Sequence, residues 1–408
     1  MQLLMKNSLK WANLSLFLLG LSIGSFPFVA SAAMVSFCFF NVLYGYFNRK
    51  EIKRWKFTYF FPIWGILVIY IACLFYSPNI SYGLKYVSRS LIFVVVPFVF
   101  WYRGGIDRNT YLKTTKFFII GVTLTCVISL LISSFNYLGS QNLEEFTYYQ
   151  LADTIHLHPT YLSLFILAAL ILLHRHKKER MLFKLFVVIV SILMLLLLQS
   201  RVAFIGLALV VVYSFISSKS MNYKRGILFF SVLIISLGFL SNDLKNRFNE
   251  IISYNPSIDA LGTFSENGIN QRVWLWNSAF KQIKKEPIFG YGFGAQRNLF
   301  QWQVEKMMIE DEFDNELYIA AKKLSDNNLH NQYLQIIYEC GYLGLFLFLG
   351  LLFFLGIILL KRKKYPELLV LVVVSIFLIT ENLFARQMGI YFFGFMFATF
   401  LSVSEEIE

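Results

Sequence analysis

Charged residues are scarce in this sequence of 408 residues. Asp, Glu, Lys and Arg make up 15% of it, whereas hydrophobic residues make up 57% and aromatic residues 18%. A composition this apolar excludes an ordinary soluble domain of this length and is typical of a membrane protein. The formal net charge of +13 does not indicate a nucleic-acid partner, because the basic residues fall in short gaps between apolar runs.

Cysteine is also scarce, and its placement excludes two kinds of site. The four cysteines lie within or at the edge of apolar runs, with no CxxC pair, so we expect small buried side chains and no disulfide framework. His156 and His158 stand two residues apart, but no third ligand stands nearby, so lining an acceptor pocket is favoured over a metal site. We expect neither a metal nor a cofactor. The cysteines are Cys38, Cys73, Cys126 and Cys340.

Long apolar runs are abundant instead. A membrane-spanning helix needs about 20 mainly apolar residues, and about twelve runs of the chain approach this length. They cover residues 11–29, 30–47, 57–76, 87–102, 117–135, 159–173, 185–198, 202–217, 226–241, 341–360, 368–380 and 390–403. The predicted fold is an all-α polytopic membrane protein with about twelve transmembrane helices and one large, partly helical loop.

One long polar interval, residues 242–335, divides the chain into three parts. Residues 1–241 are predicted to form an N-terminal bundle of about nine spans, and residues 336–408 about three spans with a short cytoplasmic tail. Residues 242–335 form the loop between them. Lys and Arg are concentrated in alternate gaps, for example at 49–56 and 175–184, and cytoplasmic loops retain such residues. This bias predicts cytoplasmic termini and an outward-facing loop.

The loop contains a predicted amphipathic helix. Its apolar residues Val273, Trp276, Phe280 and Ile283 fall three or four positions apart, which places them on one face of a helix over 271–285. Pro287 is expected to end this helix. The glycine-rich phrase at 290–294 is expected to form a flexible turn.

Three residues at the edge of the apolar runs suit chemistry on an anionic substrate. Arg201 either extends to the surface as an ordinary helix-end arginine or faces a water-filled cavity and binds phosphate. Arg272, at the start of the amphipathic helix, is either a solvated arginine or part of an anion site. His330 is either structural or a general base for an acceptor hydroxyl.

Further polar residues lie on the same predicted side. His158 lies just before the predicted span 159–173, and Tyr161 lies just inside it. We expect both to line the acceptor pocket. Arg89, Arg386 and Glu381 are charges at outward span edges, which either join the site or pair with one another.

Several short motifs surround the loop in a fixed order. They are Ser200-Arg201, Arg272 with Trp274 and Trp276, Pro287-Ile288-Phe289-Gly290-Tyr291-Gly292, and His330-Asn331-x-Tyr333-Leu334 followed by Glu339-x-Gly341-x-x-Gly344. With the predicted topology, this combination resembles the O-antigen ligase and polymerase family, bacterial membrane glycosyltransferases that use a lipid-linked donor.

The resemblance implies a reaction and roles for residues. A glycan would be transferred from undecaprenyl diphosphate to an acceptor sugar at the periplasmic face of the bacterial inner membrane, without a metal. Arg201 and Arg272 would bind the diphosphate, His330 would deprotonate or orient the acceptor hydroxyl, and a groove between spans would take the polyprenyl chain. The residues expected to bind substrate are Arg89, His158, Tyr161, Trp274, Tyr333 and Arg386.

The resemblance leaves the acceptor open. A ligase would use lipid A-core, which we favour because one large loop bears both Arg272 and His330, and a polymerase would use a second lipid-linked glycan. The expected partners are therefore the lipid-linked donor, one of these acceptors and membrane lipids. A transporter or flippase of lipid-linked oligosaccharide is a further alternative, but such proteins keep their substrate sites near the bilayer midplane.

Overall fold

The computed structural model describes residues 2–50, 52, 57–218, 220, 268–286, 288–310 and 328–403. Within these ranges the chain is helical, and its one β-type contact is an isolated bridge between Ile106 and Val403. The predicted all-α class is confirmed for this part of the chain. The main helices are α1 (Gln2–Ser22), α2 (Pro27–Phe47), α3 (Phe61–Leu74), α4 (Ile80–Ser90), α5 (Ile92–Tyr102), α6 (Arg108–Ser140), α8 (Pro159–Leu172), α9 (Met181–Leu198), α10 (Arg201–Ser217), α13 (Gly268–Ile283), α14 (Gln301–Glu310), α16 (Gln332–Lys361), α17 (Tyr365–Thr380) and α18 (Gln387–Leu401).

Short helical turns connect these helices. The elements are η1 (Phe57–Phe60), η2 (Leu143–Phe146), α7 (Tyr148–Asp153), η3 (Leu173–Arg175), η4 (Gln296–Phe300) and η5 (Leu383–Ala385). Of these, α7 and η5 matter for function because they lie beside the ends of α8 and α17.

Many of the described helices are suited to a membrane. Six helical segments are long and apolar enough to cross one, and four shorter apolar helices accompany them. The six are Pro27–Phe47, Phe57–Leu74, Ile80–Tyr102, Arg108–Ser140, Met181–Leu198 and Gln332–Lys361. These helices support a multi-pass membrane protein, although the predicted count of about twelve spans is not established by them. The predicted span 226–241 lies outside the described residues.

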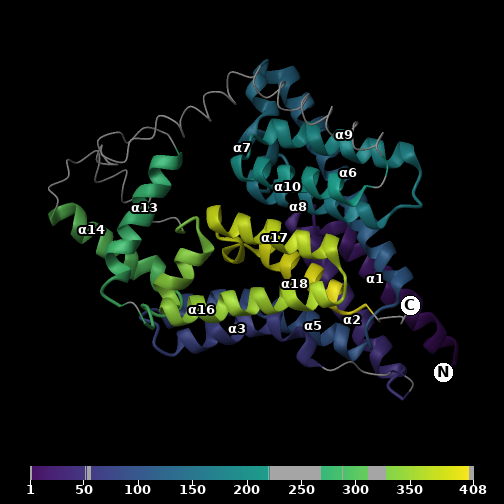
Figure 1. Ribbon diagram of the computed structural model, residues 1–408, viewed down its shortest axis with the longest axis horizontal. Helices are drawn as coiled ribbons and strands as arrows, with labels where there is room; N and C mark the ends of the chain where they lie inside the picture. Colours follow the sequence, from purple (N-terminus) through teal and green to yellow (C-terminus); the bar gives the residue numbers. More distant parts are fainter. Residues whose placement is uncertain are drawn as a thin grey trace.

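The helix pair α17 and α18 occupies the middle of the molecule. In Figure 1 this pair lies between the group of α8, α9 and α10 and the group of α16, α3 and α5. Contacts agree with this picture, since α17 packs on α8, α10 and α16, while α18 packs on α5. The end of α17 is thereby brought beside segments that are distant in the sequence.

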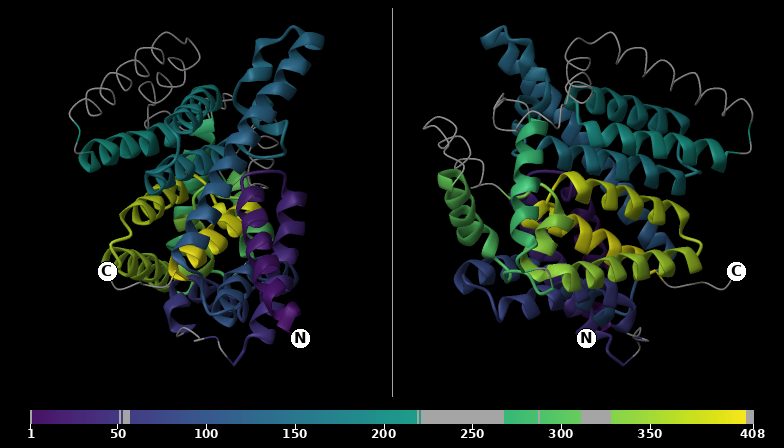
Figure 2. Two further views of the ribbon diagram at one scale, coloured as in Figure 1. Left: turned by 90° about the vertical axis from the view of Figure 1, so that its right-hand side faces the viewer. Right: turned by 60° about the vertical axis from the view of Figure 1, so that its left-hand side comes forward.

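Helices α13 and α14 lie at one end of this bundle. Figure 1 and the right-hand view of Figure 2 place them outside the long helices, and α13 runs across the direction of α16. They share a small apolar core with the start of α16, to which Leu275, Ile283, Phe300 and Tyr338 contribute. The amphipathic helix predicted over 271–285 is therefore present as α13, and it ends at Ile283; Pro287 lies outside the described residues.

A kink in α16 explains two of the sequence motifs. Gly341 has a φ of 68°, which breaks the helix and leaves the carbonyls of Tyr338 and Glu339 to accept from the N–H groups of Tyr291 and Gly292, at 2.9 and 2.8 Å. A Cβ on Gly341 would lie 2.0 Å from the Ile288 oxygen, so only glycine allows this approach. The phrase 290–294, predicted as a flexible turn, is thus held tightly against α16.

One span prediction needs extension. The run predicted at 87–102 begins earlier, at Ile80, and it is interrupted at Leu91 to give α4 and α5. The α4 segment is amphipathic, with Tyr82 and Tyr86 on one face, so its polar residues concealed it from a search for continuous apolar runs.

Candidate active site

A buried carboxylate at the end of α17 is the centre of the candidate site. Glu381 directly follows the last residue of α17, and only 1% of its surface is exposed. The O–H of Tyr161 donates to the next backbone carbonyl, that of Asn382, at 3.0 Å. Tyr161, which is predicted to bind substrate, therefore holds the backbone directly after Glu381 in place.

His330 contacts this carboxylate directly. Its Nδ1 lies 3.2 Å from Glu381 Oε1, and because an ionised carboxylate only accepts hydrogen bonds, Nδ1 carries the proton. The residue has a φ of 46°, a conformation that is uncommon outside glycine and is frequent at functional sites. Two neighbours hold this conformation: Asn328 Oδ1 accepts from the His330 N–H at 2.9 Å, and Asn331 caps α16.

Arg272 reaches the same carboxylate from α13. Its Nη2 lies 4.0 Å from Glu381 Oε2, and 30% of the side chain is exposed, so part of the guanidinium remains accessible to an anion. Two tryptophans position the helix: Trp274 is 6% exposed in the small core, and Trp276 Nε1 donates to the Leu329 carbonyl at 2.8 Å. Since Leu329 precedes His330, this bond couples α13 to the histidine. Trp274, predicted to bind substrate, thus packs behind Arg272.

His158 approaches from the start of α8. Its Nδ1 accepts from the Thr160 N–H at 3.3 Å and lies 4.0 Å from Glu381 Oε2, while its Nε2 lies 2.9 Å from the Tyr149 hydroxyl. Burial lowers the pKa of His158 to about 4, against the opposing effect of Glu381. His158 is therefore neutral at pH 7, whereas the exposed His156 turns its ring to Phe26.

These neighbours keep Glu381 ionised. Burial raises the pKa of the Glu381 carboxyl, but the hydrogen bond from His330 and the positive charge of Arg272 oppose it, and the pKa falls to about 2. A carboxylate that stays charged at neutral pH can hold the imidazole of His330 in one tautomer. The remaining ring nitrogen, Nε2, is then available to accept a proton.

Arg201 lies at the same end of the bundle. It begins α10 directly after the tight turn at Gln199 and Ser200, and it is half-buried. Gly206 of α10 lies against Phe377 of α17. The two helices run in opposite directions there, so Arg201, five residues before Gly206, comes level with Glu381, four residues after Phe377.

The other predicted substrate-binding residues are more distant from Glu381 or face other partners. Arg89 and Arg386 are exposed; the Arg89 guanidinium lies 5.4 Å from the centre of the Tyr86 ring, and Arg386 helps to lower the pKa of His158. The Tyr333 hydroxyl donates to the Ser375 carbonyl at 2.9 Å, across the space between α16 and α17. Within the part of the chain that the structure describes, none of these three side chains forms a hydrogen bond or ion pair with Glu381.

An apolar groove runs along α16 and α17 from the site. Its volume is about 730 Å³, and its lining is almost entirely aliphatic and aromatic. Tyr333 and Ile379 line one end, close in sequence to His330 and Glu381, and Leu360 and Leu368 line the other end. The groove therefore connects the polar cluster with the flank of the membrane-spanning helices.

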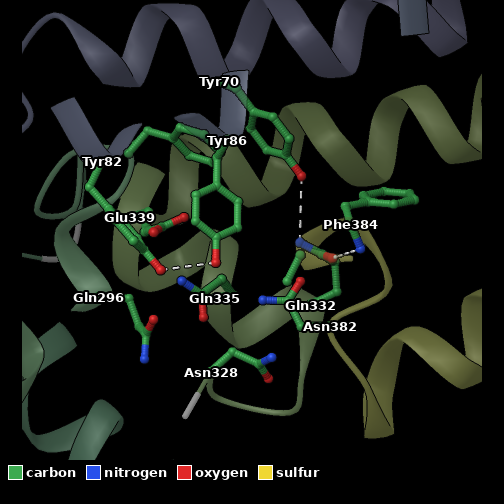
Figure 3. Close-up of a pocket in the computed structure, with 12 residues that line it drawn as sticks. Tyr70, Tyr82, Tyr86, Gln296, Asn328, Gln332, Gln335, Glu339, Asn382 and Phe384 are labelled. Carbon is green, nitrogen blue, oxygen red and sulfur yellow. Dashed lines mark hydrogen bonds between the residues drawn. The ribbon is translucent and has the colours of Figure 1, made fainter. Parts of the chain in front are cut away.

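A polar stripe on α16 was missed from the sequence. Gln332, Gln335 and Glu339 are spaced three and four residues apart, so they share one face of the helix, and all three line a small cavity (Figure 3). This spacing is visible in the sequence, but within this phrase only His330 and Tyr333 are predicted to act on substrate, and the two glutamines are not. Tyr70 and Tyr82, from α3 and α4, also line the cavity, and nothing in the sequence around them predicts this.

Comparison with known proteins adds one match. Residues 186–349 match the family model described as O-antigen ligase. The matched stretch contains Arg201, Arg272 and His330, whereas His158 and Glu381 lie outside it. No curated protein matches the chain.

Proposed function

We propose that this chain, whose residues 186–349 match the O-antigen ligase family model, transfers an O-antigen-type glycan from undecaprenyl diphosphate to a sugar hydroxyl of lipid A-core. The observation that carries the proposal is the contact of His330 with the ionised carboxylate of Glu381, with Arg272 alongside at 4.0 Å. A base and an anion-binding cation are the two groups that this transfer requires.

His330 is the base in this proposal. Glu381 holds the proton on Nδ1, so Nε2 presents a lone pair to the acceptor hydroxyl. As the acceptor oxygen forms a bond to the anomeric carbon of the donor sugar, its proton passes to Nε2. The bond from that carbon to the diphosphate oxygen breaks, and undecaprenyl diphosphate leaves with the electron pair.

Arg272 and Arg201 stabilise this leaving group. Negative charge grows on the diphosphate as the bond breaks, and fixed guanidinium groups at that position lower the energy of the transition state. A planar guanidinium donates two parallel hydrogen bonds to a phosphate, which an ammonium group cannot do. The accessible part of Arg272 and the position of Arg201 level with Glu381 support these roles.

The polyprenyl chain of the donor lies in the groove between α16 and α17 in this proposal. The groove is lined by side chains such as Leu352, Phe353 and Ile376, which suit an isoprenoid chain. Because the groove starts beside His330 and Glu381, a lipid within it would present its diphosphate to the polar cluster.

The proposed orientation follows from the basic residues of the sequence. The chain resides in the bacterial inner membrane with both termini in the cytoplasm and the cluster around Glu381 at the periplasmic face. The cluster lies at the ends of α8 and α17, which suits surface transfer better than transport through the bilayer.

Replacement of His330 or Arg272 by alanine tests the proposal in cells that depend on this chain for glycan assembly. With protein levels matched by immunoblotting, we expect lipopolysaccharide without attached O-antigen and accumulation of the lipid-linked donor. Unchanged glycan assembly with either variant would overturn the assignment as an enzyme. Shortened glycans that remain attached to lipid A-core would indicate a polymerase instead.

A further inference from the structure

A small polar cavity lies beside the pair of His330 and Glu381. Figure 3 shows its walls, which come from α3, α4, the start of α16 and the segment after α17. Asn328 and Gln332, two residues before and after His330, are among its lining residues, and so is Asn382, the neighbour of Glu381. Its volume of about 20 Å³ is the space of one or two water-sized groups.

Two buried amide oxygens in this cavity lack a donor. Gln335 is 6% exposed and Asn382 is 4% exposed, and neither Gln335 Oε1 nor Asn382 Oδ1 has a hydrogen-bond partner within the part of the chain that the structure describes. Buried polar groups in proteins are almost always paired, because an unpaired acceptor costs free energy. Two such acceptors on one cavity point to a ligand that donates hydrogen bonds.

A third amide side chain of the lining, that of Gln332, is hydrogen-bonded through both its oxygen and its nitrogen. Gln332 Oε1 accepts from the Phe384 N–H at 3.0 Å, and Gln332 Nε2 lies 3.5 Å from the Tyr70 hydroxyl, which Figure 3 shows as dashed lines. Gln332 thus ties α16 to α3 and to η5. Gln335, one turn later, is left to face the cavity.

Aromatic rings form the opposite wall. The Tyr70 ring stacks on Phe293 with centroids 4.2 Å apart, Tyr86 meets Phe293 edge-on at 6.4 Å, and the hydroxyls of Tyr82 and Tyr86 lie 3.0 Å apart. Aromatic faces beside amide groups suit a ligand that has both C–H surfaces and hydroxyls. Sugars have this combination.

The cavity contrasts in charge with the region around Arg272. Its lining includes no Lys or Arg, and its one carboxylate, Glu339, accepts from the Gly294 N–H at 3.0 Å. A diphosphate would be disfavoured there, whereas a neutral hydroxyl would be accepted. The diphosphate and the ligand of this cavity therefore occupy different places around Glu381.

We infer that this cavity is a subsite for the acceptor sugar, in which one hydroxyl or hydroxymethyl substituent donates its hydrogen to Gln335 Oε1 or to Asn382 Oδ1 and thereby holds the sugar beside His330. The inference rests on the proposed glycosyl transfer. The acceptor is favoured over the donor because His330, which acts on the acceptor hydroxyl, is flanked by lining residues, whereas the cationic groups for the donor lie elsewhere. The small volume admits one substituent and excludes a complete ring.

Kinetics of the purified protein in vesicles test this subsite. The probes are an undecaprenyl-diphosphate-linked glycan and whichever of lipid A-core or a second lipid-linked glycan the unaltered protein extends. We expect Gln335→Met, which keeps the length of the side chain but removes its polar atoms, to raise the KM for the acceptor about tenfold and to leave the KM for the donor unchanged. Asn382→Leu is expected to act in the same direction.

A matched control and a set of modified acceptors complete the test. Gln387→Met changes an exposed glutamine of α18 that bonds Ser31 and Tyr391, and we expect wild-type constants from it. Acceptors that each lack one hydroxyl would be compared. For one of them, the unaltered protein should show a KM about tenfold higher than for the complete acceptor, and Gln335→Met should not raise that KM further.

Several results would overturn the subsite. An unchanged KM for the acceptor in a folded Gln335→Met protein would do so, as would a rise in the KM for the donor instead. Folding is checked by a cooperative thermal transition like that of the unaltered protein. If the unaltered protein transfers no glycan at all, the proposed function itself fails, which is a separate outcome.

Discussion

The two ends of α17 each carry a buried glutamate, and the two differ in their partners. Glu367, in the first turn, is fully buried and accepts from Arg175 Nε and Nη2 at 2.9 and 2.6 Å, as well as from the Tyr111 hydroxyl. Glu381, after the last turn, accepts from His330 Nδ1 at 3.2 Å and from the Asn382 N–H at 3.3 Å, and it has longer contacts of 4.0 Å to Arg272 and His158.

This difference separates a structural carboxylate from one that is placed for chemistry. The Arg175 guanidinium satisfies both oxygens of Glu367, which joins the ends of α8 and α17. Glu381 instead contacts side chains that are themselves partly exposed, and its partner His330 has a strained backbone. Because the side chains of His330 and Arg272 are 20% and 30% exposed, they can contact a substrate as well as Glu381.

The largest effect is expected when the histidine at the Glu381 end is removed. His330→Ala should lower the rate of glycan transfer about 1000-fold, because a general base contributes roughly 10²–10⁴ to the rate. His176→Ala is the control at the other end of the molecule, where His176 Nε2 lies 3.0 Å from the Thr115 hydroxyl. Equal losses in the two purified variants would contradict the comparison.

The two glutamates themselves provide the next test. Glu381→Gln should keep the fold but lower kcat about 100-fold, because the amide no longer favours the proton on Nδ1 of His330. Glu367→Gln should instead lower the yield of folded protein and lower its stability by roughly 3 kcal/mol, because it leaves the half-buried Arg175 guanidinium without its full partner. The Glu367→Gln molecules that do fold should keep normal kcat. Loss of kcat in Glu367→Gln together with loss of stability in Glu381→Gln would contradict the roles given to the two glutamates.

The arginines sharpen the comparison further. Arg201→Lys should lower kcat/KM about tenfold with a lipid diphosphate donor, because a point charge does not reproduce two parallel contacts to phosphate. Arg175→Lys should lower stability and leave kcat/KM close to the wild-type value. Normal turnover by Arg201→Lys would count against its role in binding diphosphate.

The last prediction concerns stability at acidic pH, where no effect on catalysis at neutral pH is involved. The pKa of His158 is about 4 in the folded protein against an ordinary value of 6.5, so the unfolded chain binds this proton more readily. Stability from this residue is present above pH 6.5 and is lost as the pH falls from 6.5 towards 4, by at most about 3 kcal/mol. His158→Gln should therefore weaken the fall in melting temperature across this window, and an equally steep fall in this variant would contradict the assignment.

The helices and several residues of the candidate site could be predicted from the sequence. The central position of Glu381, which the other residues of the site contact, could not. The apolar runs predicted α8, α9 and α10, and the three-and-four spacing predicted α13. Glu381 was noted only as one of several charges at span edges. Its closeness to His330 depends on how α16 and α17 pack, which local spacing does not contain.

The glycines show the same limit. The phrase 290–294 was predicted as a flexible turn because glycine permits many conformations. In the structure Gly290 and Gly341 are required because two backbones pass at close distance, and this contact joins segments about fifty residues apart. Such a role becomes visible only when both segments are placed in space.

Transfer by purified protein in vesicles tests the central claim most directly. The protein would be supplied with an undecaprenyl-diphosphate-linked glycan together with lipid A-core or a second lipid-linked glycan, and the products would be separated by mass. We predict that the unaltered protein attaches the glycan to lipid A-core and that His330→Ala does not. Transfer by His330→Ala at the wild-type rate, or extension of neither acceptor by the unaltered protein, would contradict the claim.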